Sequence, residues 1–256
     1  MTTAEFSALR LERAPGLLRV GLTRGAISGT VLTELHAALD LAEADPDCRV
    51  VALHGADGVF CTGMDFADAA GHLGDGGELA RVGGEEFLGL LRRFTLAPRV
   101  VVSLVDGWTS GGGVGLVAAS DFVFATARSQ FGLPEALWGL LPCCVLPFLI
   151  RRVGFQKAYT MSLSTRSVPA EAAERWHLVD ELTERPDTAL RTLLARLRRL
   201  DAATVADLKR YCRAQWSGSA AGEELALREF ARLMADETVA GRISDFTTHR
   251  KFPWEA

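Results

Sequence analysis

Three short loops in this sequence have residue types that can stabilise negative charge or move a proton. Two are dense in glycine, around Gly63 in FCTGMDF and in the run Gly111–Gly115. A backbone without a Cβ can approach a ligand closely and offer its N–H groups as hydrogen-bond donors. The third loop, FGLPEALWG, has one acidic residue, Glu135, among apolar neighbours. Such shielding raises the pKa of a carboxyl group, which suits a general base or acid.

Other common catalytic motifs do not occur in the chain. The glycine run does not have the G-x-G-x-x-G spacing of a dinucleotide site, and no phosphate-binding G-x-x-x-x-G-K-S/T loop exists. There is also no H-E-x-x-H zinc motif, no C-x-x-C pair and no G-x-S-x-G nucleophile elbow. We therefore expect neither a nucleotide cofactor nor a metal.

The composition is that of a globular protein with a substantial core. Of the 256 residues 48% are hydrophobic and the formal net charge is -4, which excludes a disordered chain. Acidic residues outnumber basic ones by 32 to 28, so no nucleic-acid partner is expected. No apolar run reaches the roughly 18 residues of a membrane span. Five cysteines without paired spacing, and a start without a signal-peptide core, predict a cytoplasmic location.

Strand and helix patterns alternate along the first part of the chain, and the pattern becomes mostly helical after Pro169. Short β-branched runs predict strands, and apolar residues at helical spacing predict a helix over residues 28–42. The alternation indicates an α/β protein in one continuous domain with a helical C-terminal extension. The predicted strands are 17–22, 50–54, 100–104 and 122–125, and the later predicted helices are 170–176, 188–200, 202–215 and 223–234.

Taken together and in this order, the three loops resemble the enoyl-CoA hydratase/isomerase, or crotonase, superfamily. Its members read roughly F-x-x-G-x-D, then G-G-G-x-x, then F-x-x-P-E, and this chain has FCTGMD, GGGVG and FGLPE. The motifs are specific jointly, and the resemblance covers most of the first 180 residues. It implies a spiral of strand, strand, helix (ββα) repeats with the active site in residues 1–190, and a helical C-terminal trimerisation region in residues 191–256.

The resemblance also implies an oxyanion hole, a pair of N–H donors that stabilise a thioester oxygen as it becomes an enolate. By the family pattern the donors are the backbone amides of Met64 and Gly112, with Gly63 and Gly111 beside them in contact with the substrate. Losing one such donor typically costs about 2.7 to 4 kcal/mol of transition-state stabilisation. The alternative to this catalytic role is a structural one, in which the glycine run only permits close packing of a helix.

The resemblance further implies an acid–base residue, because two glutamates flank the substrate in the hydratases. Glu135 matches the second, whereas the first falls on Gly115, so a simple addition of water by two glutamates is not expected. Asp65 is the nearest candidate for a second catalytic acid, and an N-cap of the following helix is its structural alternative. For Glu135 the alternative is an exposed capping acid after Pro134.

Two tryptophans near the predicted loops are further candidates for substrate contact. Trp108 precedes the glycine run and Trp138 follows Glu135, although large rings of this kind are more often core residues. His54, His72, Arg81 and Trp108 are candidates for binding a second, distal carboxylate of the substrate.

Within the superfamily the chain resembles the dehydratases of polyketide β-branching cassettes. The resemblance rests on the apolar segment GLLPCCVLPFLIRRVGFQKA, on Gly115 and on the ending HRKFPWE. It implies that water is lost from 3-hydroxy-3-methylglutaryl-ACP to give 3-methylglutaconyl-ACP, where ACP is an acyl carrier protein. The sister decarboxylases use a loop lysine, and no lysine precedes Lys157 here.

Two other functions remain as alternatives from the sequence. One is an enoyl-CoA hydratase or isomerase that acts on free CoA esters, and the other is a non-catalytic acyl-binding protein. For the dehydratase, the resemblance implies no cofactor beyond the phosphopantetheine or CoA that carries the substrate. It also implies an acyl carrier protein as partner and a homotrimer or hexamer.

Overall fold

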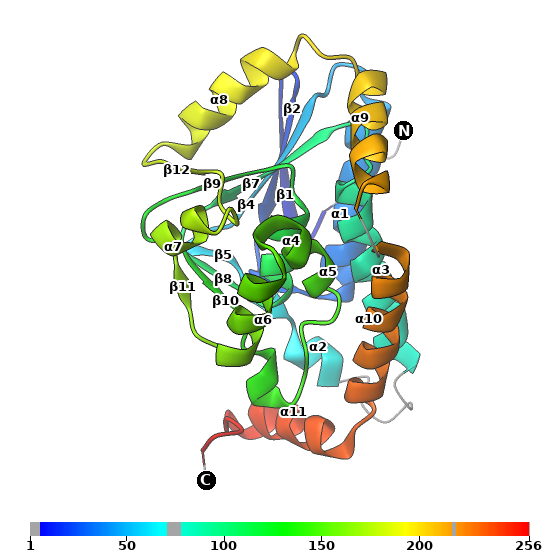
Figure 1. The fold of residues 1–256 in the computed structure, drawn as a ribbon, viewed down its shortest axis with the longest axis vertical. Coiled ribbons are helices and arrows are strands. Elements are labelled where there is room, and N and C mark those ends of the chain that lie inside the picture. Colours follow the sequence, from blue (N-terminus) through cyan, green and yellow to red (C-terminus); the bar gives the residue numbers. More distant parts are fainter. Residues whose placement is uncertain (1–5, 71–77, 217–218, 256) are drawn as a thin grey trace.

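The computed structural model describes residues 6–70, 78–216 and 219–255, and within these ranges the strands form three sheets (Figure 1). In the largest sheet the first two strands pair antiparallel, and the other neighbours are parallel. In spatial order its strands are β1 (Leu9–Ala14), β2 (Leu17–Leu22), β4 (Val50–His54), β7 (Val100–Val105), β9 (Phe122–Ala125) and β12 (Glu181–Leu182).

Successive strands alternate between this sheet and the two smaller ones, which gives the predicted ββα spiral. The strands β2, β4, β7 and β9 lie in the large sheet. Each is followed by one or two strands of the smaller sheets and then by a helix, which is a short 3-10 helix in the last case. The fold class predicted from the sequence is therefore confirmed. The following elements are β3 (Ala26–Ile27), α1 (Gly29–Ala44), β5 (Val59–Cys61), β6 (Gly63–Met64), α3 (Glu78–Phe94), β8 (Trp108–Ser110), α4 (Gly112–Ala119) and β10 (Gln130–Gly132).

The second half of the chain is mostly helical, and the helices α8 and α11 lie at opposite ends of the long axis (Figure 1). No described helix is both long and apolar enough to cross a bilayer. The remaining elements are α2 (Phe66–Ala70), η1 (Glu135–Trp138), α5 (Leu146–Val153), α6 (Phe155–Ser164), β11 (Val168–Pro169), α7 (Ala170–Arg175), α8 (Pro186–Leu197), α9 (Ala202–Ala214), α10 (Ser219–Met234) and α11 (Glu237–His249).

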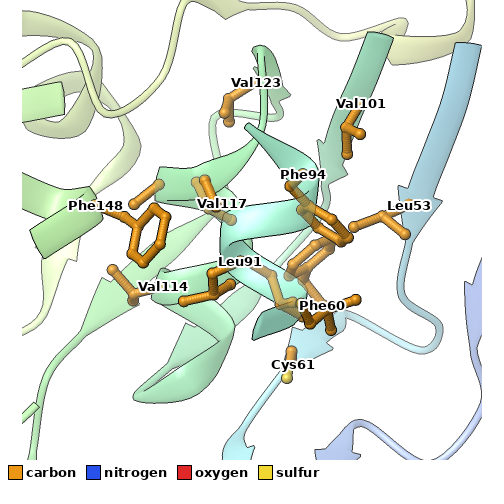
Figure 2. Packing of buried hydrophobic residues seen from close by; sticks show 14 of the residues in the cluster. Leu53, Phe60, Cys61, Leu91, Phe94, Val101, Val114, Val117, Val123 and Phe148 are labelled. Carbon is orange, nitrogen blue, oxygen red and sulfur yellow. The ribbon is translucent and has the colours of Figure 1, made fainter. Parts of the chain in front are cut away.

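The helix α4, which begins in the glycine run, is the centre of the main core. Every residue from Gly113 to Ala119 is buried, as expected for a helix that is apolar on all sides. Figure 2 shows Val114 and Val117 of α4 between Phe148 of α5 and Leu91 of α3. The first turn of α4 is consequently held on both sides by packed side chains.

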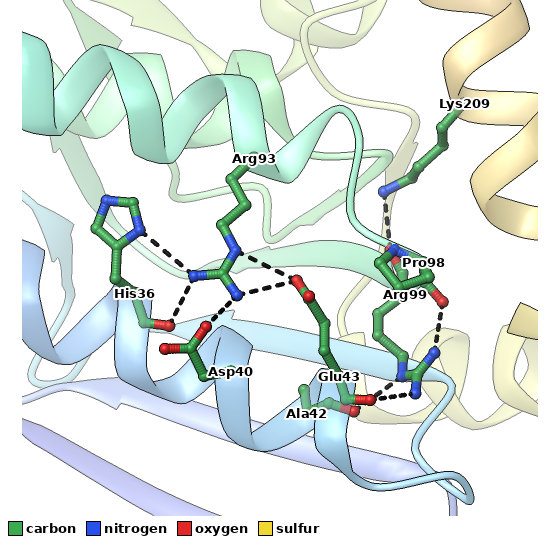
Figure 3. Close-up of polar contacts among 8 residues, drawn as sticks. All are labelled: His36, Asp40, Ala42, Glu43, Arg93, Pro98, Arg99 and Lys209. Carbon is green, nitrogen blue, oxygen red and sulfur yellow. Dashed lines mark hydrogen bonds and ion pairs between the residues drawn. The ribbon is translucent and has the colours of Figure 1, made fainter.

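The helix α3 is tied to α1 by a cluster of charged side chains (Figure 3). Arg93 donates hydrogen bonds to the backbone oxygen of His36 at 3.1 Å and to Glu43 Oε1 at 3.1 and 3.2 Å, and it also pairs with Asp40. Arg99, just after α3, is buried and donates to the carbonyl groups at the C-terminus of α1. Bonds to these otherwise unsatisfied carbonyls stabilise the end of a helix. The position of α3 is thus fixed from the α1 side.

On its other side α3 packs against α10, and a buried glutamate joins them. Glu223 of α10 accepts hydrogen bonds from Arg92 at 2.6 and 2.9 Å and pairs with Arg213 of α9. At Gly84 the helices approach so closely that a Cβ would lie 2.8 Å from the ring of Phe230. The three helices α3, α9 and α10 therefore share one ion-pair network.

We predict that Glu223→Ala lowers the free energy of unfolding by about 3 kcal/mol, because it leaves the guanidinium of Arg213 without its partner in a buried site. Denaturant unfolding measures the change. Glu224→Ala is the matched control: its exposed pair with Arg228 should contribute about 0.5 kcal/mol or less. Equal effects of the two substitutions would contradict the assignment of a stabilising network.

Candidate active site

The two glycine loops predicted as donor sites touch each other in the structure. Gly63 has φ +88, and a Cβ built on it would lie 3.0 Å from the backbone oxygen of Ser110 and 3.1 Å from the backbone nitrogen of Gly112. Only glycine permits this conformation and this approach together. Met64 follows directly and pairs with Ile27 in the short parallel sheet of β3 and β6. The amides predicted as donors, those of Met64 and Gly112, therefore belong to loops in direct contact.

The helix α4 starts at this contact. Gly111 is its N-cap with φ 54, and the N–H of Gly111 donates to the backbone oxygen of Gly132 at 3.0 Å. Gly112 is the first helical residue, so its N–H has no acceptor within the helix. The positive end of the helix dipole adds to the attraction for an oxyanion at this point.

Glu135 is the first residue of η1, and its carboxyl group lies against Gly111. A Cβ built on Gly111 would be 3.3 Å from Glu135 Oε1. The other oxygen, Oε2, is buried and has no hydrogen-bond partner among the described residues. Burial raises the pKa of Glu135 to about 7, although its own backbone N–H opposes the shift. The exposed capping acid weighed from the sequence does not match this carboxyl group, because its Oε2 atom is buried.

Position 115, where the family pattern places the first glutamate, is enclosed by apolar side chains. A Cβ on Gly115 would lie 3.1 Å from Phe87 Cζ, 3.1 Å from Val145 Cγ2 and 3.3 Å from Leu91 Cδ1. These distances are shorter than ordinary van der Waals contacts, so a larger residue would displace its neighbours. The sequence predicted the missing carboxylate but not Phe87, which comes from α3, an element that the strand and helix patterns did not identify.

Asp65 acts on the backbone of α2. Its Oδ1 accepts hydrogen bonds from the N–H groups of Ala67 at 2.9 Å and Asp68 at 3.3 Å, which is the geometry of an N-cap. Its own N–H donates to the backbone oxygen of Ile27 at 3.0 Å. These contacts match the N-cap that was the structural alternative for Asp65. A catalytic role for Asp65 remains a prediction.

The two tryptophans lie in different environments. Trp108 is 39% exposed, so it is not a core residue, and its indole packs over Gly132. Trp138 is buried in an aromatic cluster, with ring centroids 4.7 Å from Phe66 and 5.1 Å from Phe246. Substrate contact remains a prediction for both. The cluster joins η1 to α2 and α11 and so supports the turn that begins with Glu135.

The described candidates for a distal carboxylate have separate local contacts. His54 Nδ1 lies 3.0 Å from the backbone oxygen of Gly55, Arg81 pairs with Glu85, and His72 lies outside the described residues. Within the described part of the chain, no group of three or more His, Cys, Asp or Glu side chains is arranged to hold a metal ion.

We predict that Glu135→Gln becomes more stable relative to wild type as the pH rises. The folded-state pKa of about 7 lies above the ordinary value of 4.5, so the stability from this group is complete below pH 4.5 and is lost as the pH rises to 7. The amide does not titrate. The difference in unfolding free energy should therefore grow over this range to on the order of 3 kcal/mol and then stay constant.

Glu34→Gln provides the control of opposite sign. Burial alone would raise the pKa of Glu34, but N–H groups of Ser7, Ala8 and Leu9 donate to its carboxylate and lower the pKa overall. Its stability contribution is present above its unfolded pKa and is lost on acidification. Glu34→Gln should therefore lose stability relative to wild type as the pH rises. If the difference in unfolding free energy from wild type changed with pH in the same direction for both variants, the raised pKa of Glu135 would be contradicted.

Comparisons with known proteins agree with this geometry. The family model for enoyl-CoA hydratase/isomerase matches residues 13–256. The bacillaene synthase dehydratase PksH of Bacillus subtilis is 34% identical over 229 residues, which are 90% of this chain and 88% of that protein. The mevalonyl-coenzyme A hydratase SIDH of Beauveria bassiana is 32% identical over 193 residues, 69% of this chain and 68% of that protein.

Solved structures extend the similarity to the fold. The crystal structure of a polyketide biosynthesis enoyl-CoA hydratase, pksH of Bacillus subtilis, has a TM-score of 0.88 and 29% identity, and the match covers 97% of this chain and 100% of that one. AtuE of Pseudomonas aeruginosa has a TM-score of 0.78 and 34% identity, with 98% and 100% covered. The chain therefore belongs to the enoyl-CoA hydratase/isomerase family and is an enzyme of the hydro-lyase type.

Proposed function

We propose that the chain dehydrates a 3-hydroxyacyl thioester, and that the substrate is 3-hydroxy-3-methylglutaryl-ACP, which becomes 3-methylglutaconyl-ACP in polyketide β-branching. The observation that carries the proposal is the buried Oε2 of Glu135, which has no partner in the described part of the chain and lies beside the two touching glycine loops. Similarity to a bacillaene synthase dehydratase over 90% of the chain supports both the direction of the reaction and its setting.

In this proposal the thioester oxygen binds between the backbone N–H groups of Met64 and Gly112. As the proton leaves the α-carbon, negative charge moves to this oxygen, and fixed donors stabilise it without reorganisation. Gly63 and Gly111 allow the close approach, because a Cβ on either would occupy space needed by neighbouring groups.

Glu135 then serves both proton transfers. Its carboxylate takes the α-proton, and the electron pair of the C–H bond forms the enolate. When the enolate collapses, the α,β double bond forms and the β-carbon to oxygen bond breaks. The leaving hydroxyl takes the proton back from Glu135 and departs as water. A group with a pKa of about 7 is suited to accept and donate at neutral pH.

Asp65 is the alternative donor to the leaving hydroxyl. Its hydrogen bonds to the first turn of α2 favour the mechanism in which Glu135 acts alone. The proposal needs no cofactor, since the phosphopantetheine of the carrier protein, or CoA, holds the acyl group. The five cysteines are free and four are buried, which supports a reducing, cytoplasmic location.

Hydration or isomerisation of free CoA esters is the second candidate function. It is favoured by the relatives named as CoA hydratases, such as the mevalonyl-coenzyme A hydratase of Beauveria bassiana. The side chains of Phe87, Val145 and Leu91 around position 115 argue against the two-glutamate form of that reaction.

Mass spectrometry distinguishes the candidates. The purified protein is incubated with 3-hydroxy-3-methylglutaryl-ACP, with the matching CoA ester and with crotonyl-CoA, and a mass change of one water is followed. We expect the carrier-bound substrate to lose water. Reaction of the CoA esters alone would favour the second candidate, and no reaction with any of the three would favour a non-catalytic acyl-binding protein.

We predict that Glu135→Gln lowers the turnover of the carrier-bound substrate by about 100-fold to 10,000-fold, because an amide does not accept the α-proton. Asp65→Asn should keep turnover within about tenfold of wild type, because asparagine also caps helices well. Initial rates by mass spectrometry measure both. A larger loss in Asp65→Asn than in Glu135→Gln would reverse the two assignments.

We also propose that the chain forms a homotrimer or hexamer through α6. Phe155 and Leu163 are each 66% exposed, and Tyr159 lies between them at helical spacing, with its ring stacked on that of Phe155. A row of large apolar side chains of this kind is typical of an interaction surface. The helix α6 lies outside residues 191–256, where the resemblance implies the trimerisation region. In that region Leu233 is buried and Phe230 packs on α3, whereas Leu225 of α10 is 52% exposed.

Sedimentation tests the assembly. The mass of wild type from sedimentation should be three or six times the 27.6 kDa of one chain. Leu163→Glu should shift it to smaller species, because a charge buried in an interface is costly. Thr33→Glu, on an exposed position of α1 outside both α6 and residues 191–256, is the control and should change nothing. A wild-type monomer, or a Leu163→Glu variant that assembles normally, would contradict the proposal.

A further inference from the structure

The ring of Phe87 lies directly on the first turn of α4. Its Cζ is 3.3 Å from a Cβ built on Gly112 and 3.1 Å from one built on Gly115. Ile27 Cδ1 comes within 2.8 Å of the Gly112 position, and Val145 Cγ2 within 3.1 Å of the Gly115 position. Phe87 itself is only partly buried. These three side chains form an apolar wall beside the helix residue that bears the proposed oxyanion donor.

The carboxyl group of Glu135 lies at a different part of the same turn. It touches Gly111, whereas Gly112 and Gly115, which are three residues apart and share a helix face, are covered by the apolar wall. A thioester bound at the Gly112 amide is therefore placed between a carboxyl group and an apolar surface. The β-carbon is only two bonds from the carbonyl carbon, so its substituents lie within reach of that surface.

We propose that Phe87 determines the specificity of the site for substrates with an alkyl branch on the β-carbon. Its ring occupies the volume beside Gly115 where a second carboxylate would stand, and it packs against an alkyl branch on the β-carbon of the substrate. This proposal rests on the proposed function and assigns the preference for a branched β-carbon to one side chain. A methyl branch removes apolar surface of the ring from water, whereas a hydrogen atom leaves that surface uncovered.

Binding without turnover tests the proposal. The Glu135→Gln variant is titrated calorimetrically with two pantetheine thioesters, 3-hydroxy-3-methylglutaryl and 3-hydroxyglutaryl, which differ only by the methyl branch. We expect the branched ligand to bind about tenfold tighter, as is typical for one methyl group in an apolar pocket. Adding Phe87→Ala should bring the ratio of the two affinities close to one, and Phe87→Leu should keep most of the preference.

Phe87→Leu is the control for loss of the fold, because residue 87 of α3 still packs an apolar side chain against α4. Binding of the unbranched ligand shows whether a substitution has damaged the site in general. Equal binding of the two ligands to Glu135→Gln, or a ratio that Phe87→Ala leaves unchanged, would overturn the proposal. Failure of wild type to dehydrate the carrier-bound substrate would count against the proposed function alone, because the affinity ratio is measured without turnover.

Discussion

The contact between two stretches of bare backbone is the constraint on which the rest of the site depends. Gly63 approaches Ser110 and Gly112 so closely that any Cβ would meet backbone atoms at 3.0 and 3.1 Å. Backbone atoms cannot move aside as a flexible side chain does, so a substitution there would separate the loops. The sheet of β3 and β6 on one side and the buried helix α4 on the other hold the two loops in this contact. Placement of the donor groups is therefore a property of the core.

The electrostatics of the site follow from what surrounds Glu135. The main cause of its raised pKa is burial and not a neighbouring charge. The ionised form is stabilised poorly, since Oε2 has no partner among the described residues. Unsatisfied buried groups of this kind cost stability and are kept where a reaction uses them. The apolar wall, which includes Phe87 and Val145, lies at a different part of the same turn and presents carbon atoms beside Gly115.

Local patterns in the sequence were sufficient for the strands β2, β4, β7 and β9 of the large sheet and for the three loops, but not for the short strands of the smaller sheets. The predicted strand 122–125 coincides with β9, because short β-branched and aromatic runs are distinctive. The helix α3 was not predicted, since glycines at positions 83, 84 and 89 obscure its helical pattern. The wall at Gly115 and the aromatic contacts of Trp138 join segments far apart in the sequence, and no local pattern contains them. The cap formed by Asp65 is different, because its partners Ala67 and Asp68 are adjacent in the sequence and the cap was one of the two expected roles. The exposure of Cys212 depends on the fold.

The aromatic cluster around Trp138 links the proposed catalytic turn to residues that come much later in the chain. Phe246, Phe252 and Trp254 all pack on Trp138, whose own segment begins with Glu135. During synthesis on the ribosome all three sequence motifs emerge well before these partners do. The turn would then stand without its covering rings until α11 is made and docks. The order of translation thus delays completion of the site, and a chain released early would contain every motif without the packing that positions Glu135.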